Sequence, residues 1–327
     1  MKIIAMLGDS HTWGEGVGAD YGLVPPAQCS DLRMLPFCFP SYVNLIRDAY
    51  SLMTDSHAEE YYAEKLTDLC GKADGQFGIV DKKSLVIEEN FLLCRIFLKA
   101  QNEKARAKIT VDGKLYGDYE IQSGENGMNK CIRLINVRLR EEAHKLEITA
   151  ESGTGIYVHR IEFYSGEYAV VNCGVGSCTV ERYIKEYFDK YIAELNPYAV
   201  VFEGCTVNDW LSGKTLAAYG ADIERMIQLV NNCTQKLVMH TTFPVTDGIY
   251  YGDGINSYDE YVDTARRTAQ KNGIPVADCH AAAQKLILAV PIEKRNSFMH
   301  HDKWHPNGTG HYLYATTLLQ YITFVIK

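Results

Sequence analysis

The hydrophobic pattern divides the chain into parts with different periodicity. Residues 2–7 form an apolar run that ends at Gly8, as in a strand buried on both faces of a parallel sheet. Residues 41–50 carry apolar positions at helical spacing, and after Tyr168 short apolar runs alternate with helical stretches. This alternation predicts a parallel sheet with right-handed helical connections. The further predicted strands are 169–171, 199–202, 237–239 and 275–277, and the further helices are 180–195, 215–231, 258–271 and 280–288.

The middle of the chain, from about residue 55 to residue 165, shows no long helical period. Its short apolar runs predict strands, and Asp112-Gly113 is a strong hairpin-turn signal. The predicted strands are 85–87, 92–98, 107–111, 114–116, 131–137, 145–150 and 156–163. We therefore predict an α/β fold. A flavodoxin-like parallel sheet forms a three-layer α/β/α domain from residues 1–54 and 167–327, and residues 55–166 form an inserted all-β, jelly-roll-like sandwich.

The composition is that of an ordinary globular protein and narrows the choice of partners. The 327 residues are enough for two domains. The formal net charge of −8 argues against a nucleic-acid partner, because such proteins usually carry a basic face. Residues 312–326 are apolar, but polar residues interrupt them and they are shorter than a bilayer requires. We expect a core-packing helix there and no membrane partner, while the oligomeric state stays open.

The ten cysteines are scattered without Cys-x-x-Cys pairs. Several of them, including Cys94, Cys173 and Cys205, lie in apolar stretches, which predicts buried free thiols rather than disulfides. The apolar run at the N-terminus is too short for a signal peptide. Together these features predict a cytoplasmic protein.

Four polar motifs lie where parallel α/β proteins carry their chemistry. Three follow predicted strands and the fourth precedes the last predicted helix. They are Gly8-Asp9-Ser10-His11-Thr12, Asn172-Cys173-Gly174-Val175-Gly176-Ser177, Glu203-Gly204-Cys205-Thr206-Val207-Asn208-Asp209 and Asp302-Lys303-Trp304-His305-Pro306-Asn307. Ligands of open parallel sheets bind beyond the carboxyl ends of the strands, so we expect these motifs to meet at one edge of the sheet.

The motifs in this order resemble those of the SGNH, or GDSL, hydrolase superfamily. Gly-Asp-Ser follows an N-terminal strand, Asn-Asp follows a middle strand, and Asp-x-x-His-Pro precedes the last helix. The resemblance covers the α/β parts at both ends of the chain and leaves the predicted β insertion unmatched. It implies a serine esterase that hydrolyses small acyl esters and needs no cofactor.

The residue types fit this chemistry. A serine hydroxyl is a weak nucleophile until a neighbouring imidazole takes its proton. We predict that Ser10 is the nucleophile, that His305 is the base, and that Asp302 orients His305 and stabilises its charged form. The Asp-x-x-His spacing places Asp302 and His305 on one local turn.

The resemblance also implies an oxyanion hole. It assigns this role to the backbone N–H of Ser10, to the side-chain amide of Asn208, and to a backbone N–H in the second motif, where Gly176 and Ser177 are equal candidates. The third motif departs from the usual Gly-x-Asn-Asp, because Thr206 occupies the glycine position. Asn208 itself matches.

The substrate class follows only by analogy. Superfamily members with an added β-sandwich are often esterases that remove acetyl groups from carbohydrates, so we expect a small-molecule or carbohydrate acyl ester. A lipase, thioesterase or acyltransferase with the same triad is the alternative within enzymes, and an inactive glycan-binding protein is the alternative outside them. Trp13, Trp210 and Trp304 adjoin the motifs and are equally consistent with a substrate pocket and with core packing.

Two other patterns predict no additional chemistry. Residues 14–18 are rich in glycine, but Gly-Asp-Ser occupies the turn where a dinucleotide-binding motif would begin. His300, His301, His305 and His311 lack a second set of ligands, so we predict no metal site.

Overall fold

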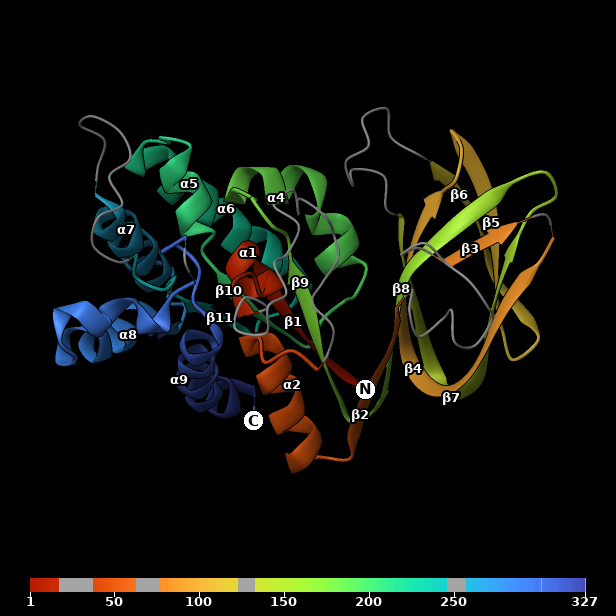
Figure 1. The fold of residues 1–327 in the computed structure, drawn as a ribbon, viewed down its shortest axis with the longest axis horizontal. Coiled ribbons are helices and arrows are strands. Elements are labelled where there is room, and N and C mark those ends of the chain that lie inside the picture. Colours follow the sequence, from red (N-terminus) through yellow and green to blue (C-terminus); the bar gives the residue numbers. More distant parts are fainter. Residues whose placement is uncertain are drawn as a thin grey trace. The chain divides into compact units, whose positions relative to one another are not determined.

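The computed structural model describes residues 1–17, 38–62, 77–80, 82–122, 133–245, 257–300 and 302–326. These residues divide into two compact units. The α/β unit contains residues 2–17, 38–49 and 170–326, and the β unit contains Tyr50–Ala169. Figure 1 shows the two units as a helix-rich part and a strand-rich part of the chain.

The α/β unit is built on a sheet with the spatial order β12-β11-β10-β1-β9. Its strands are β1 (Lys2–Gly8), β9 (Tyr168–Gly174), β10 (Ala199–Glu203), β11 (Leu237–His240) and β12 (Val276–Ala277). β10 is parallel to both β1 and β11, and β11 is parallel to β12. The chain places β9 on one side of β1 and all later strands on the other. Ligands bind beside such a reversal of strand order, at the carboxyl ends of β1 and β10.

Helices surround this sheet in Figure 1. They are α1 (Ser10–Trp13), α2 (Tyr42–Met53), α4 (Val180–Glu186), α5 (Thr206–Leu211), α6 (Leu216–Cys233), α7 (Tyr258–Lys271), α8 (Cys279–Ala289) and α9 (Gly308–Ile326), with a 3-10 helix at Ile292–Phe298. The expected helix over 180–195 is interrupted, because Asp189–Ala193 forms a π-helical turn that buries the adjacent residues Tyr191 and Ile192.

The expected core-packing helix near the C-terminus is present. α9 buries Tyr314, Ala315, Leu318 and Ile322. Among the described residues, no helix combines the length and hydrophobicity needed to cross a bilayer. The seven cysteines in the described residues carry free thiols, and the buried ones include Cys94, Cys173 and Cys205 as predicted.

The β unit contains one hydrogen-bonded sheet with the order β2-β8-β4-β7-β5-β6, and β3 also pairs with β8. The strands are β2 (Ser56–Tyr62), β3 (Phe77–Val80), β4 (Ser84–Ala100), β5 (Lys104–Val111), β6 (Lys114–Gln122), β7 (Arg133–Ala150) and β8 (Gly155–Gly166). The predicted hairpin joins β5 to β6, and positive φ angles of 45° at Asp112 and 76° at Gly113 give the turn its primed geometry.

Two long strands replace pairs of shorter predicted ones. The predicted strands 85–87 and 92–98 both belong to the single strand β4. The predicted strands 131–137 and 145–150 both belong to β7, except that residues 131–132 lie outside the described residues. The polar segment 88–90 breaks the apolar pattern of β4, but pairing with β7 continues across a bulge. Because pairing depends on the partner strand, the pattern of β4 alone could not reveal this continuity.

Candidate active site

Three predicted residues from the two ends of the chain form one line of contacts. Ser10 is the first residue of α1, directly after β1, and its Oγ lies 2.8 Å from Nε2 of His305. Nδ1 of His305 lies 2.7 Å from Oδ2 of Asp302. Because the carboxylate can only accept, Nδ1 carries the hydrogen and Nε2 is left to accept the proton of Ser10. Ser10 and His305 are 3% and 7% exposed, so this contact is shielded from water.

The predicted local turn holds Asp302 against His305. Oδ1 of Asp302 accepts the backbone N–H groups of Trp304 and His305 at 2.8 and 3.0 Å. Burial alone would raise the pKa of Asp302, but the hydrogen bonds and charge of His305 hold it well below its ordinary value. Nδ1 of His300 lies 2.9 Å from the same carboxylate. Asp302 is therefore a stable anion behind the imidazole of His305.

His11 is a second histidine in the site, and its role was not foreseen from the sequence. Its Nδ1 lies 3.1 Å from Oδ1 of Asp9, and its Nε2 lies 2.9 Å from the carbonyl oxygen of Trp304. Both partners are acceptors, so both ring nitrogens donate and the ring is an imidazolium. Burial alone would lower the pKa of His11, but the charge of Asp9 raises it to about 9. His11 thus connects the Ser10 segment to the His305 segment.

Glu203, at the carboxyl end of β10, is a buried acid in contact with the segment that carries Ser10. It accepts the backbone N–H groups of Asp9 and Cys205 and contacts the hydroxyl of Thr242. Burial and the nearby charge of Asp9 raise the pKa of Glu203 to about 8. Burial alone would also raise the pKa of Asp9, but His11 holds it below its ordinary value. At neutral pH the site therefore contains, next to Ser10, an Asp9–His11 ion pair and a largely neutral Glu203.

One group of side chains in the site could in principle bind a metal ion. Donor atoms of Asp9, Glu203 and Cys205 lie within 4.8 Å of one another. The oxygens of Asp9 are already bound by His11 and Asn208, and those of Glu203 by N–H and O–H groups. These hydrogen bonds already occupy the carboxyl oxygens, so the contacts favour the protein network over a metal site.

Asn208 and Asp209 fix the third motif to its neighbours. Nδ2 of Asn208 donates to Oδ2 of Asp9 at 2.8 Å, which leaves its second N–H hydrogen for another acceptor. Oδ2 of Asp209 accepts the N–H of Val180 at the start of α4, and its Oδ1 lies 3.1 Å from Nζ of Lys214. Asn208 is thereby oriented by the Ser10 segment.

The second motif lies directly against α1. A Cβ atom at Gly174 would come 2.2 Å from the backbone nitrogen of Trp13, so only glycine permits this approach. Gly176 is buried, whereas Ser177 is exposed with φ +55°. Within the described residues, the backbone N–H of neither Gly176 nor Ser177 donates a hydrogen bond, so either could serve a ligand.

The three tryptophans differ in exposure. Trp13 and Trp210 are 2% and 9% exposed, and Trp210 packs edge-on against Tyr258 with ring centres 5.3 Å apart. Trp304 is partly exposed, and its carbonyl oxygen binds His11. Core packing therefore accounts for the positions of Trp13 and Trp210, and a substrate contact stays a prediction for all three.

The remaining sequence candidates take structural positions. Gly14 caps α1 with φ +107°, while Gly18 and His301 lie outside the described residues. His311 is buried in α9, accepts the N–H of Tyr42 at Nδ1 and donates from Nε2 to the carbonyl oxygen of Glu15. Burial lowers the pKa of His311 to about 3, so it is neutral.

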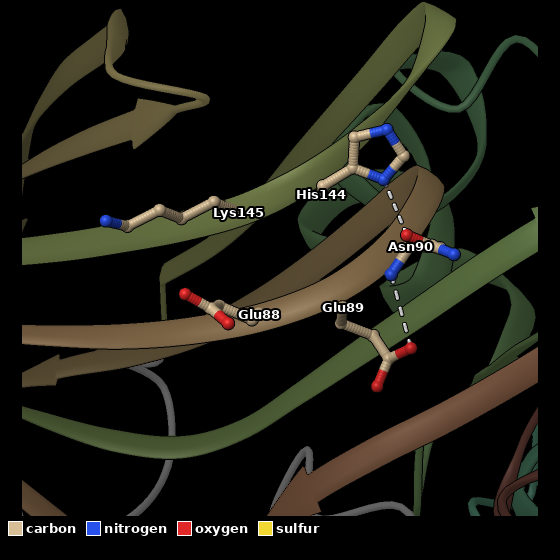
Figure 2. A pocket seen from close by; sticks show the side chains of 5 residues that line it. All are labelled: Glu88, Glu89, Asn90, His144 and Lys145. Carbon is tan, nitrogen blue, oxygen red and sulfur yellow. Dashed lines mark hydrogen bonds between the residues drawn. The ribbon is translucent and has the colours of Figure 1, made fainter.

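A polar pocket also lies on the β unit, at the bulge of β4 beside β7 (Figure 2). Its lining residues are Glu88, Glu89, Asn90, His144 and Lys145. Nδ1 of His144 lies 2.6 Å from Oδ1 of Asn90, and Figure 2 shows these two side chains directed toward each other. The five lining residues include no serine or cysteine.

This geometry can support acyl transfer through a serine. A family model described as GDSL-like lipase/acylhydrolase matches residues 116–313, more than half of the chain. The matched segment includes Asn208, Asp302 and His305 and begins after Ser10. The chain belongs to this family and is a serine ester hydrolase.

Solved structures with low sequence identity are similar to this chain. A peptidoglycan O-acetylesterase matches 100% of the chain and 91% of its own length, with 14% identity and a TM-score of 0.55. Together with the family match, this likeness supports the SGNH hydrolase fold. An acetylxylan esterase from Geobacillus stearothermophilus matches 49% of this chain and 74% of its own length, with 20% identity and a TM-score of 0.41. A lipase/acylhydrolase from Enterococcus faecalis matches 48% and 77%, with 22% identity and a TM-score of 0.38. No curated protein sequence matches the chain.

Proposed function

We propose that Ser10, His305 and Asp302 are the catalytic triad of an esterase that removes small acyl groups, acetyl above all, from carbohydrates. The line of contacts from Asp302 through His305 to Ser10, at 2.7 and 2.8 Å, carries this proposal. Geometry of this kind lets one imidazole act as base and then as acid.

In the acylation step, Oγ of Ser10 forms a bond to the carbonyl carbon of the ester while its proton moves to Nε2 of His305. The bond from that carbon to the alcohol oxygen then breaks, and Nε2 gives the proton to the departing alcohol. Water attacks the acyl carbon next and passes a proton to Nε2. The bond from that carbon to Oγ then breaks, and Nε2 returns the proton to Oγ, which releases the acid and free Ser10. Asp302 stays ionised and stabilises the imidazolium of His305 in both steps.

The proposed oxyanion hole has three donors. They are the backbone N–H of Ser10, the backbone N–H of Gly176 or Ser177, and the second N–H of the Asn208 amide. The contact of Asn208 with Asp9 supports this role, because it orients the amide before substrate arrives. Each such donor stabilises the transition state by about 3 kcal/mol.

The substrate class is supported by the solved structure that matches the whole chain. That protein is a peptidoglycan O-acetylesterase, and the match extends over both units of this chain. A partly exposed Trp304 next to His305 is also in keeping with stacking on a sugar ring.

The detailed architecture belongs to the same proposal. We propose that residues 1–54 and 167–327 form a three-layer α/β/α domain and that residues 55–166 form an inserted β-sandwich. One apolar core of the β unit contains Ile79 from β3 and Ile121 from β6, which lie near opposite ends of the strand order, as expected for a sheet that folds over itself. The free thiols support a reducing compartment such as the cytoplasm.

Hydrolysis of p-nitrophenyl esters tests the proposal. Wild type should cleave the acetate faster than the butyrate and octanoate, and Ser10→Ala should lower kcat by about ten-thousand-fold or more without changing the melting temperature. Ser152→Ala is the matched control, because Ser152 is an exposed serine of the β unit. Retention of more than a tenth of wild-type activity in Ser10→Ala would contradict the role of Ser10. A panel of acetylated sugars then tests the substrate class.

A further inference from the structure

Glu15 occupies a fixed position beside the proposed triad. Its backbone N–H donates to the carbonyl oxygen of Ser10 at 2.9 Å, and its own carbonyl oxygen accepts from Nε2 of His311 at 3.2 Å. The next residue, Gly16, has φ +95°, and a Cβ atom there would come 2.3 Å from the carbonyl oxygen of Pro306. The backbone of Glu15 is therefore held between the Ser10 segment, the His305 segment and α9.

The side chain of Glu15 approaches the nitrogen that exchanges protons with the substrate. Its Oε2 lies 3.5 Å from Nε2 of His305, the atom that also contacts Ser10. This distance is too long for a good hydrogen bond, and Asp302 already orients the imidazole from the other side. The carboxylate is 29% exposed, and no lysine or arginine of the described residues pairs with it.

A carboxylate in this position has acceptor capacity to offer a ligand. The alcohol oxygen of the ester must come within about 3 Å of Nε2 to receive its proton. Groups attached to the first or second carbon of the alcohol part then fall within reach of Oε2 of Glu15. A hydroxyl there can donate to the carboxylate, whereas a negatively charged group there is repelled.

We propose that Glu15 is a specificity-determining residue that accepts a hydrogen bond from a hydroxyl beside the ester in the alcohol part of the substrate. The inference rests on the proposed function of Ser10 and His305. It narrows the substrates to acyl esters of uncharged polyols and sugars that keep a free neighbouring hydroxyl.

Two acetates of equal size test this inference. In 2-hydroxyethyl acetate the alcohol part ends in a hydroxyl, and in propyl acetate a methyl group takes its place. Wild type should favour the hydroxyethyl ester in kcat/KM by about tenfold to a hundredfold, as expected for a hydrogen bond to a charged acceptor. In Glu15→Ala the ratio should fall to near one, and in Glu15→Gln it should be intermediate, because the amide oxygen still accepts but carries no charge.

Glu194→Ala is the matched control. Glu194 is an exposed glutamate that precedes β10, whereas Ser10 follows the carboxyl end of β1. Glu194→Ala should keep the wild-type ratio of kcat/KM between the two esters. The acetate ester of glycolate adds a test of charge. Wild type should hydrolyse this anionic ester poorly, and Glu15→Gln should improve it by about tenfold.

The outcomes separate the inference from the function on which it rests. If wild type is folded but hydrolyses none of these esters and no p-nitrophenyl acetate, the proposed function fails. If wild type is active and Glu15→Ala keeps the wild-type ratio between the two uncharged esters, the role of Glu15 is wrong. If Glu15→Ala does not fold, the same criterion applies to Glu15→Gln, which preserves the size of the side chain.

Discussion

Both units of the molecule bury charged groups, but they neutralise them in different ways. In the β unit, Glu162 lies 3.0 Å from Nη1 of Arg95 and 2.8 Å from Nε of Arg160. In the α/β unit, the ion pair is formed by Asp9 and His11, beside the neutral acid Glu203. Guanidinium groups keep their proton at any ordinary pH, whereas each member of the second network can gain or lose one.

This difference separates a structural use of buried charge from a chemical one. The charges of the β unit lie on paired strands of the sheet, and the charges of its two guanidinium groups are permanent. Those of the α/β unit lie at the carboxyl ends of β1 and β10, where the neighbouring Ser10 and His305 exchange a proton in the proposed reaction. Burial alone therefore does not indicate a functional site, whereas mutually dependent titratable groups at strand ends do.

The largest expected difference between the units is in catalysis. Asp302→Asn should lower kcat by about ten-thousand-fold, because a neutral amide cannot stabilise the imidazolium of His305 and favours the wrong tautomer. The same exchange at Asp118, which pairs with Arg106 in the β unit, should leave kcat unchanged. Steady-state hydrolysis of p-nitrophenyl acetate measures both. A loss of less than tenfold in Asp302→Asn would remove Asp302 from the triad.

The second expected effect is on stability. Glu162→Gln removes the buried negative charge that faces the guanidinium of Arg95 and should lower the free energy of unfolding by about 3–5 kcal/mol. Urea unfolding followed by circular dichroism measures this loss, and kcat below the transition should stay within about twofold of wild type if the network is only structural. Glu120→Gln is the control, because the pair of Glu120 with Lys104 is exposed and should contribute little. An unchanged unfolding midpoint in Glu162→Gln would remove the distinction between the two networks.

The fold was largely predictable because its central strands are buried on both faces. Continuous apolar runs indicate such strands without any knowledge of their neighbours, and all the strands predicted for the parallel sheet are present. The predictions were less accurate where pairing decides the structure. Polar residues 88–90 interrupt the pattern of β4, yet its partner β7 keeps the strand continuous.

The candidate site was predictable chiefly in the groups that we propose to react. Ser10, Asp302 and His305 stand in short motifs with a defined spacing, and the structure brings their side chains into contact. The positions of His11 and Glu203 depend on contacts between distant segments, such as that of His11 with the carbonyl oxygen of Trp304. Nothing local distinguishes a buried imidazolium from an ordinary histidine, although His11 directly follows Ser10.

The third expected effect is a difference between the two networks of buried charge in how stability depends on pH. The pKa of His11 is raised from 6.5 to about 9 by Asp9 against the effect of burial, and burial raises the pKa of Glu203 from 4.5 to about 8. The folded protein therefore holds protons that the unfolded chain releases, and its stability should fall as pH rises toward 9. For His11 the loss between pH 6.5 and 9 is about 3 kcal/mol.

The β unit should respond in the opposite window. Burial alone would raise the pKa of Glu162, but Arg95 and Arg160 hold it below 4.5, so its stabilising contribution is lost only as pH falls below that value. Urea unfolding at several pH values from 3 to 9 checks both statements. His11→Gln should flatten the loss between pH 6.5 and 9, and stability that stays constant or rises in wild type over this interval would contradict the imidazolium assignment.

The smallest expected effect compares two glycines, one from each unit. Gly16 and Gly113 have φ +95° and +76°, so replacing either by alanine should destabilise the protein by about 1–2 kcal/mol through backbone strain. A Cβ atom at Gly113 meets nothing within 4 Å, whereas one at Gly16 would lie 2.3 Å from the carbonyl oxygen of Pro306 and 3.1 Å from Cβ of His305.

Only Gly16→Ala should therefore affect the reaction. The segment that carries His305 must move to admit the methyl group, and a displacement of about 1 Å there lowers kcat by about tenfold to a hundredfold. Gly113→Ala should keep the kcat of wild type while it loses the same stability from strain. Melting temperatures and kcat of the two variants, measured side by side, separate strain from displacement. Equal kcat values would mean that the backbone contact between Gly16 and Pro306 does not position His305.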